Sequence, residues 1–136
     1  MKSDLTGYRV LVVEDEYFLA ADLDHALSAA GAKVIGPLGR LDDALAQVRN
    51  DGFDLAVLDI NLGGGLAYEV ADALAAQSIP FVLATAYSPS EIPERYMGHC
   101  FLEKPYQPHS VIRALAGLIA DHRQRNATGA MSIVAV

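Results

Sequence analysis

Polar residues that could hold a cation and a phosphoryl group follow four separate apolar runs of this chain. The acids Glu14 and Asp15 end "LVVED", and Asp59 ends "AVLD". A hydroxyl, Thr85, ends "VLAT", and an ammonium, Lys104, ends "CFLEK". A single polar residue after an apolar run is common, but this set is not. It predicts one site where three carboxylates, a hydroxyl and a cation converge.

The crowded carboxylates favour a hard divalent cation. Two like charges about 4 Å apart repel by roughly 4 kcal/mol at an effective dielectric constant near 20, so such acids raise one another's pKa or recruit a cation. Oxygen ligands without nearby His or Cys suit Mg²⁺. We expect Asp15 and Asp59 to be direct ligands, with Glu14 in the outer shell. The alternative is that the acids only favour a helix N-terminus, and we expect that of Glu16, as an ordinary first-turn residue.

A metal beside a carboxylate, a lysine and a hydroxyl could carry out phosphoryl transfer. The metal and Lys104 would neutralise charge on the phosphoryl oxygens, and a carboxylate would be the nucleophile. Asp59 is the expected nucleophile because its run is predicted to be the central strand. Thr85 could donate a hydrogen bond to a phosphoryl oxygen. Considered alone, Thr85 could simply be a residue that favours a β-strand, and Lys104 could be a solvated cation in a loop.

Short apolar runs alternate with segments of helical period, and these elements must position the site. The predicted strands cover residues 9–13, 33–36, 54–58, 80–84 and 100–103. Strands of continuous apolarity separated by helices indicate a parallel sheet covered on both faces. Right-handed crossovers then give a doubly wound, three-layer α/β domain with five strands in the flavodoxin-like order 2-1-3-4-5. In such sheets ligands bind beyond the carboxyl ends of the strands.

Prolines and the C-terminal sequence set the expected ends of the remaining strands and helices. Pro37 is expected to stop the second of five strands, and a short fourth helix is expected from Ser90 to about Met97, with Pro93 in its first turn. The last of five helices is expected to end near Arg125. We therefore predict a domain over 1–125 and a tail over 126–136, too short for an output domain. Its apolar end, 130–136, could pack on the domain, self-associate or stay disordered.

Composition narrows the functional classes. The chain has 136 residues, and 17 acids against 10 Lys and Arg give a net charge of -7, which disfavours binding to nucleic acid or anionic membranes. Cys100 is the only cysteine, which excludes an internal disulfide or a Cys-based zinc site. There is no signal-peptide pattern and no apolar run of membrane-spanning length. We expect a cytoplasmic protein.

The segments "VVEDE", "AVLDINL", "ATAY" and "LEKPY" together resemble the receiver domain of two-component response regulators, over about residues 8–123. The resemblance implies that Asp59 accepts a phosphoryl group from a histidine of a sensor histidine kinase or a histidine phosphotransfer protein. Glu14 and Asp15 match the acidic pair that places Mg²⁺. Asn61, two residues past Asp59, would offer its backbone carbonyl to the metal.

The same resemblance assigns the other residues near the site. Thr85 matches the switch hydroxyl, and Ala86 the small residue that keeps the site accessible. Lys104 matches the invariant lysine, and its bond to Pro105 is typically cis in the family. Phe101 matches the aromatic residue that moves inward when the hydroxyl turns toward the phosphoryl group.

The segments "PFVLATAY" and "NLGGG" resemble the single-domain regulators sometimes called FATGUY, with Ala86 where that motif has Gly. The resemblance implies a free-standing regulator that is no enzyme beyond its own phosphorylation and dephosphorylation. It would alter binding to a downstream protein or act as a phosphate sink, and homodimers are common in the family. A dehalogenase-type phosphatase is disfavoured because position 61 is Asn, not a second acid. A phosphorylation-independent pseudo-receiver remains the alternative, although such proteins usually lack a site residue and none is missing here.

Overall fold

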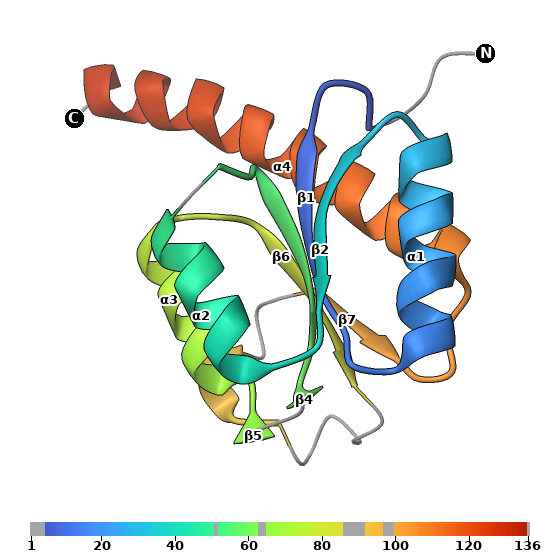
Figure 1. The fold of residues 1–136 in the computed structure, drawn as a ribbon. Coiled ribbons are helices and arrows are strands. Elements are labelled where there is room, and N and C mark those ends of the chain that lie inside the picture. Colours follow the sequence, from blue (N-terminus) through green and yellow to red (C-terminus); the bar gives the residue numbers. More distant parts are fainter. Residues whose placement is uncertain (1–4, 51, 63–64, 86–91, 97–99, 136) are drawn as a thin grey trace.

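Five strands that are apolar along most of their length form the central sheet of the protein (Figure 1). The computed structural model describes residues 5–50, 52–62, 65–85, 92–96 and 100–135. The elements are β1 (Arg9–Val13), α1 (Tyr17–Ala29), β2 (Lys33–Leu38), α2 (Leu41–Asn50), β3 (Leu55–Asp59), β4 (Asn61–Leu62), β5 (Gly65–Leu66), α3 (Tyr68–Ala76), β6 (Phe81–Thr85), the 3₁₀ turn η2 (Glu94–Tyr96), β7 (Cys100–Glu103) and α4 (Pro108–Ala135).

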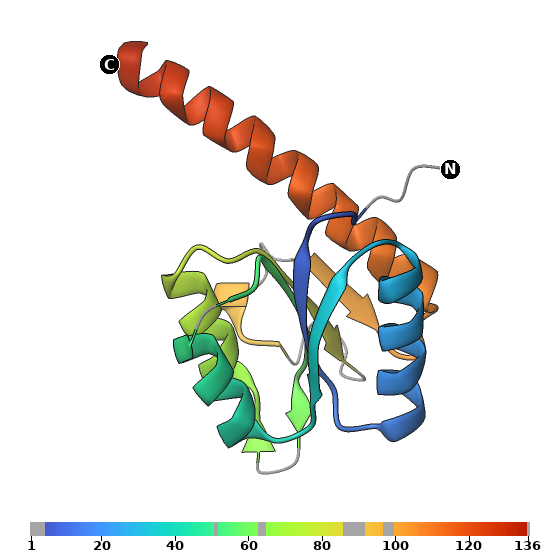
Figure 2. The same ribbon diagram turned by 45° about the horizontal axis from the view of Figure 1, so that its top comes forward.

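The sheet is parallel and its strand order is β2-β1-β3-β6-β7. Strands β4 and β5 pair only with each other, as a short antiparallel ribbon, so the five sheet strands have the predicted order 2-1-3-4-5. Helices α1 and α4 cover one face of the sheet, and α2 and α3 cover the other (Figure 1 and Figure 2). The predicted doubly wound, three-layer fold is confirmed.

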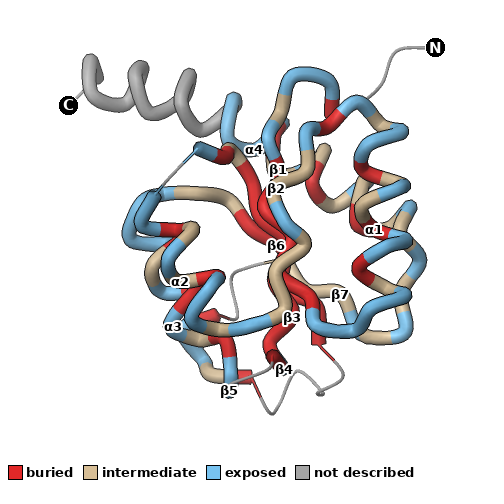
Figure 3. Tube along the Cα trace, in the orientation of Figure 1, coloured by how far each residue is buried: buried red, intermediate tan, exposed pale blue. Residues whose placement is uncertain are grey.

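Two apolar clusters fill the space on either side of the sheet. Successive strand residues point to opposite faces, so Leu11 and Leu58 pack under α2 and α3, whereas Val12 and Val57 pack under α1 and α4. Strands β3 and β6 are buried along their whole length (Figure 3). The last residues of these two strands are therefore attached to a backbone that is packed on both faces of the sheet.

The second strand is longer than predicted, because Pro37 lies within β2 instead of ending it. β2 is an edge strand, where a proline without an N–H group is tolerated. Gly36 precedes it with φ of +100°, and a Cβ there would lie 2.8 Å from the carbonyl oxygen of Val12. The pairing register with β1 shifts between Leu11 and Val13 at this point.

The last helix is also longer than predicted, since α4 continues to Ala135 instead of ending near Arg125. Its C-terminal part projects beyond the sheet (Figure 2). No proline follows Pro108, and a single glycine such as Gly129 costs a helix only about 1 kcal/mol. Most of the predicted tail is therefore helical. Within the described part of the chain, no helix is both long enough and apolar enough to cross a membrane.

The fourth helix was predicted over a segment whose ends, Ser90 and Met97, lie outside the described residues. Among the described residues between them, 92–96, the structure has the 3₁₀ turn η2, and the described part of the chain contains four α-helices. The buried Tyr96 fastens this turn to α3: its hydroxyl donates to the Asp72 carboxylate, and its ring stacks on Tyr68 with 5.4 Å between centroids. Arg95 pairs with Asp72 at 3.2 Å. Sequence periodicity did not indicate this network.

Candidate functional site

The predicted chemical residues meet at the C-terminal edge of the sheet. Glu14 and Asp15 follow β1, and Asp59 ends the neighbouring strand β3. Lys104 follows β7, and its backbone N–H donates to the carbonyl of Thr85 at the end of β6, at 2.8 Å. Residues from four strands therefore converge, as the strand-end pattern predicted.

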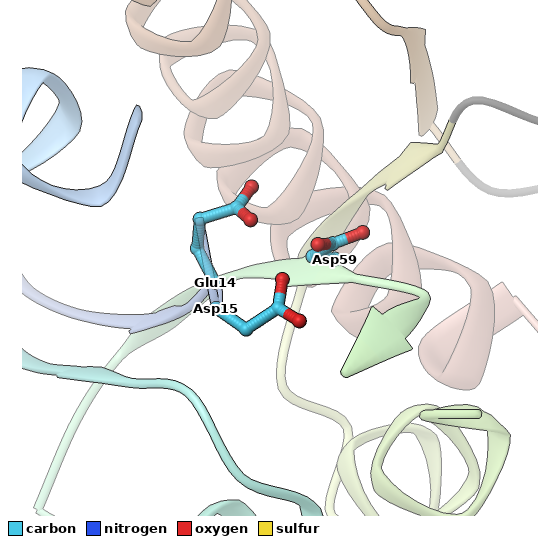
Figure 4. A group of neighbouring side chains, drawn as sticks. All are labelled: Glu14, Asp15 and Asp59. Atoms are coloured by element: carbon cyan, nitrogen blue, oxygen red, sulfur yellow. The ribbon is translucent and has the colours of Figure 1, made fainter. Parts of the chain in front are cut away.

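Three carboxylates face one another at this edge (Figure 4). Oxygens of Glu14, Asp15 and Asp59 all lie within 4.8 Å of one another. Glu14 and Asp59 are buried, with 3% and 2% of their surface exposed, whereas Asp15 is exposed. The acids open onto a pocket of about 420 Å³, and the residues that line it are Asp15, Glu16, Asp59, Asn61 and Lys104.

Backbone groups orient the two buried acids. The N–H of Glu16 donates to Oε2 of Glu14 at 3.1 Å, and the N–H of Asn61 donates to Oδ1 of Asp59 at 3.2 Å. Gly39 lies against the acidic turn, where a Cβ would be 3.3 Å from the Cα of Asp15. The turn after each strand thus holds its carboxylate in a fixed direction.

Lys104 is the cation that these acids share. Its Nζ lies 3.1 Å from Oε1 of Glu14 and 3.1 Å from Oδ2 of Asp59. It also lies 3.8 Å from Oε2 of Glu16. The prediction that Glu16 is an ordinary first-turn residue is therefore wrong: it precedes α1 at the N-cap position and adds a carboxylate to the field around Lys104. One ammonium is thus shared by three acids, which are Glu14, Glu16 and Asp59.

Burial and crowding change the protonation of the site. Burial, followed by the nearby Glu14 carboxylate, raises the pKa of Asp59 to about 7, against the opposing effect of Lys104. For Lys104, burial lowers the pKa, but the Asp59 and Glu14 carboxylates outweigh burial and raise it overall. Lys104 thus stays charged while the acids retain excess negative charge. Oxygen donors with uncompensated charge fit a hard dication such as Mg²⁺.

The remaining predicted residues lie around this cluster. Thr85 is buried at the end of β6, and alternation places it on the same sheet face as Phe101, which pairs with Leu83 and packs under α2 and α3. The Lys104–Pro105 peptide bond is cis, as predicted. Ala86 lies outside the described residues. Thr85 and Phe101 therefore share one face, as a coupled pair would require.

Tyr106 was missed by the sequence reasoning. It lies two residues past Lys104, and its hydroxyl is buried near Glu14. Burial raises its pKa, and the Glu14, Asp59 and Glu16 carboxylates raise it further. An aromatic residue after "KP" is the only signal in the sequence, and it does not say where the hydroxyl points.

Comparisons with known proteins agree with this geometry. Residues 10–116 match the family model of the response regulator receiver domain. The solution structure of SdrG from Sphingomonas melonis Fr1 is 40% identical in sequence with a TM-score of 0.72, and the match covers 86% of this chain and 98% of that chain.

More distant relatives match the same region. The chemotaxis response regulator CheY4 of Vibrio cholerae is 27% identical with a TM-score of 0.72, and the match covers 83% of this chain and 99% of that chain. An uncharacterized transcriptional regulatory protein, YbdJ of Bacillus subtilis, is 24% identical over 122 residues. That match covers 87% of this chain but 53% of YbdJ, so the chain spans about half the length of this curated relative.

Proposed function

Because this chain belongs to the response regulator receiver domain family, we propose that it is a single-domain response regulator that is phosphorylated on Asp59. The observation that carries the proposal is the position of Asp59: a buried carboxylate at the end of the central strand, 3.1 Å from Lys104 and within the acid cluster. The alternative, a phosphorylation-independent binding module, has no need of a shared ammonium and three converging acids.

The proposed reaction transfers a phosphoryl group from a phosphohistidine to Asp59. An oxygen of the Asp59 carboxylate attacks phosphorus, an O–P bond forms, the N–P bond to the imidazole breaks, and the leaving imidazole nitrogen takes up a proton. Lys104 neutralises charge on a phosphoryl oxygen, and the Thr85 hydroxyl donates to another. The partner is a sensor histidine kinase or a histidine phosphotransfer protein.

The residues that would hold Mg²⁺ are Glu14, Asp15, Asp59 and the backbone carbonyl of Asn61. When bound, Mg²⁺ supplies charge neutralisation for the phosphoryl oxygens. Without that neutralisation, the protonation of Asp59 competes with its role as a nucleophile, because its pKa is raised to about 7.

Phosphorylation would change how the protein binds a downstream protein, or make it a sink for phosphoryl groups. Thr85 and Phe101 share a sheet face, and this supports their proposed role as a coupled switch. The net charge of -7 favours a protein partner over nucleic acid. The proposal places the protein in the cytoplasm, beside the catalytic domains of its kinases.

The proposal is tested with phosphoramidate, a small donor whose P–N bond resembles that of phosphohistidine. Wild-type protein with Mg²⁺ should gain one phosphoryl group by intact mass, and a chelator should prevent the gain. Asp59→Ala should gain none under the same conditions. A wild type whose mass stays unchanged, also with a competent kinase, would reject the proposal.

A further inference from the structure

The 3₁₀ turn η2 connects the two chain segments that leave the proposed phosphorylation site. One segment runs from Asp59 at the end of β3 to the start of α3, and the other runs from Thr85 at the end of β6 to η2. At the strand ends the two are neighbours, and the N–H of Ile60 donates to the carbonyl of Ala84 at 3.2 Å. Farther along, the contacts of Tyr96 with α3 join the two segments again. A movement of either segment relative to the other would therefore strain the contacts of Tyr96.

The segment that follows Asp59 is held by backbone hydrogen bonds as far as α3. The N–H of Ala67 donates to the carbonyl of Ile60 at 2.8 Å, and the N–H of Ala71 donates to the carbonyl of Ala67 at 3.1 Å. Strands β4 and β5 pair with each other between these points. Tyr68 is the first residue of α3. The start of α3 is thus fixed to the residue that follows Asp59.

Tyr96 and Arg95 hold η2 against this end of α3, and we call their contacts with Tyr68 and Asp72 the α3 latch. The Tyr96 hydroxyl lies within hydrogen-bond distance of the Tyr68 carbonyl, at 3.0 Å, and of the Asp72 carboxylate. Nε of Arg95 donates to Oδ1 of Asp72 at 3.2 Å, and the guanidinium lies 4.5 Å from the centroid of the Tyr96 ring. Only 2% of Tyr96 is exposed. Opening the latch therefore separates a buried hydroxyl from its acceptors, which is unfavourable.

The latch lies on the same face of the sheet as the proposed switch residues. Ile92 and Tyr96 are buried in the apolar cluster under α2 and α3, and Phe101 packs against that cluster. In the proposed function, the Thr85 hydroxyl donates to a phosphoryl oxygen on Asp59. Because the chain after Thr85 leads to Ile92 and η2, an approach of Thr85 to the phosphoryl group would pull on the latch.

We propose that the α3 latch holds η2 in the position it has in the unphosphorylated protein and opens when Asp59 is phosphorylated. The latch contacts stabilise only the unphosphorylated conformation, so they oppose the binding of a phosphoryl group by their own free energy. Opening the latch would change the surface that η2 and α3 present to a downstream protein. This inference rests on the proposed function.

The test measures the affinity for beryllofluoride, a mimic of the phosphoryl group, in the presence of Mg²⁺. Tyr96→Phe removes the latch hydroxyl and keeps the stacked ring. This variant should bind the mimic about three- to tenfold more tightly than wild type. Asp72→Ala removes the carboxylate that accepts from both Tyr96 and Arg95, and it should tighten binding at least as much. Binding that is unchanged or weaker in these variants would overturn the proposal.

Asp54→Asn is the matched control for a loss of stability alone. It breaks the ion pair of Asp54 with Arg9, at 3.0 Å, which lies at the opposite end of β3 from Asp59. This variant should unfold more readily than wild type at neutral pH and bind beryllofluoride like wild type. If Asp54→Asn tightened binding as much as Tyr96→Phe, general destabilisation would explain the effect and the proposal would be overturned. A wild type that binds no beryllofluoride would refute the proposed function, and this inference with it.

Discussion

Replacing Asp59 with asparagine is expected to stabilise the metal-free protein, by an amount that grows with pH. The pKa of Asp59 is raised from 3.8 to about 7, first by burial and then by Glu14. Between these two values the native carboxyl binds a proton and the unfolded carboxyl does not. The free energy of unfolding therefore falls as pH rises through this interval. Asparagine resembles the protonated carboxyl and lacks this dependence.

The magnitude follows from the width of the interval. It spans about three pH units, and each unit is worth about 1.4 kcal/mol, so the full effect is on the order of 4 kcal/mol. Asp59 is 2% exposed, which leaves little screening by solvent. Above pH 7, Asp59→Asn should be about 2 to 4 kcal/mol more stable than wild type. The difference should vanish near pH 4, where both native side chains are neutral.

Urea unfolding across pH, in buffer with a chelator, measures this difference. Asp54→Asn is the matched control of opposite sign, because a side-chain hydrogen bond from Arg9 lowers the pKa of Asp54. That variant should be less stable than wild type at neutral pH, and the loss should shrink as the pH falls below 3.8 and disappear below the lowered pKa of the native carboxyl. An Asp59→Asn variant no more stable than wild type above pH 7, or a difference independent of pH, would refute the reasoning.

Other substitutions separate the roles of neighbouring residues. Asp15→Asn should weaken Mg²⁺ binding and phosphorylation together by at least tenfold. Glu16→Gln should change each only a few-fold, because the Glu16 carboxylate is exposed and lies 3.8 Å from the ammonium of Lys104. Isothermal titration with Mg²⁺ compares the two variants, and equal effects would contradict the assignment of Asp15 as a ligand. Tyr96→Phe should lower the free energy of unfolding by about 1 to 2 kcal/mol, because Asp72 loses a buried hydrogen-bond donor while the ring stacking remains. Denaturant unfolding measures this change, and an unchanged free energy of unfolding would mean that the Tyr96 hydroxyl contributes nothing to stability.

The sheet and most of the site were predictable because they depend on short-range patterns. Continuous apolar runs indicated buried parallel strands, and the residue after each run indicated the crevice where Asp59 and Lys104 meet. The register of a parallel sheet then brings such strand ends to one edge without further information. The three acids that could hold a metal ion were identified from their residue types and from their positions after predicted strands.

The features that were missed depend on tertiary position. Pro37 is tolerated because its strand lies at the edge of the sheet, and the pattern "IGPL" does not carry that information. The local sequence indicates only that Glu16 is an acid at the start of a helix, because Lys104, the cation that it contacts, is distant along the chain. Tyr106 and Tyr96 are likewise defined by where their hydroxyls point, which no local spacing specifies.

The most direct test of the central claim is to locate the phosphoryl group after incubation with phosphoramidate and Mg²⁺. Borohydride reduction followed by peptide mass spectrometry marks an aspartyl phosphate at the residue that carries it. We expect modification at Asp59 that depends on Mg²⁺ and is absent from Asp59→Asn. Modification at another residue, or at Asp59 to the same extent with a chelator present, would contradict the claim.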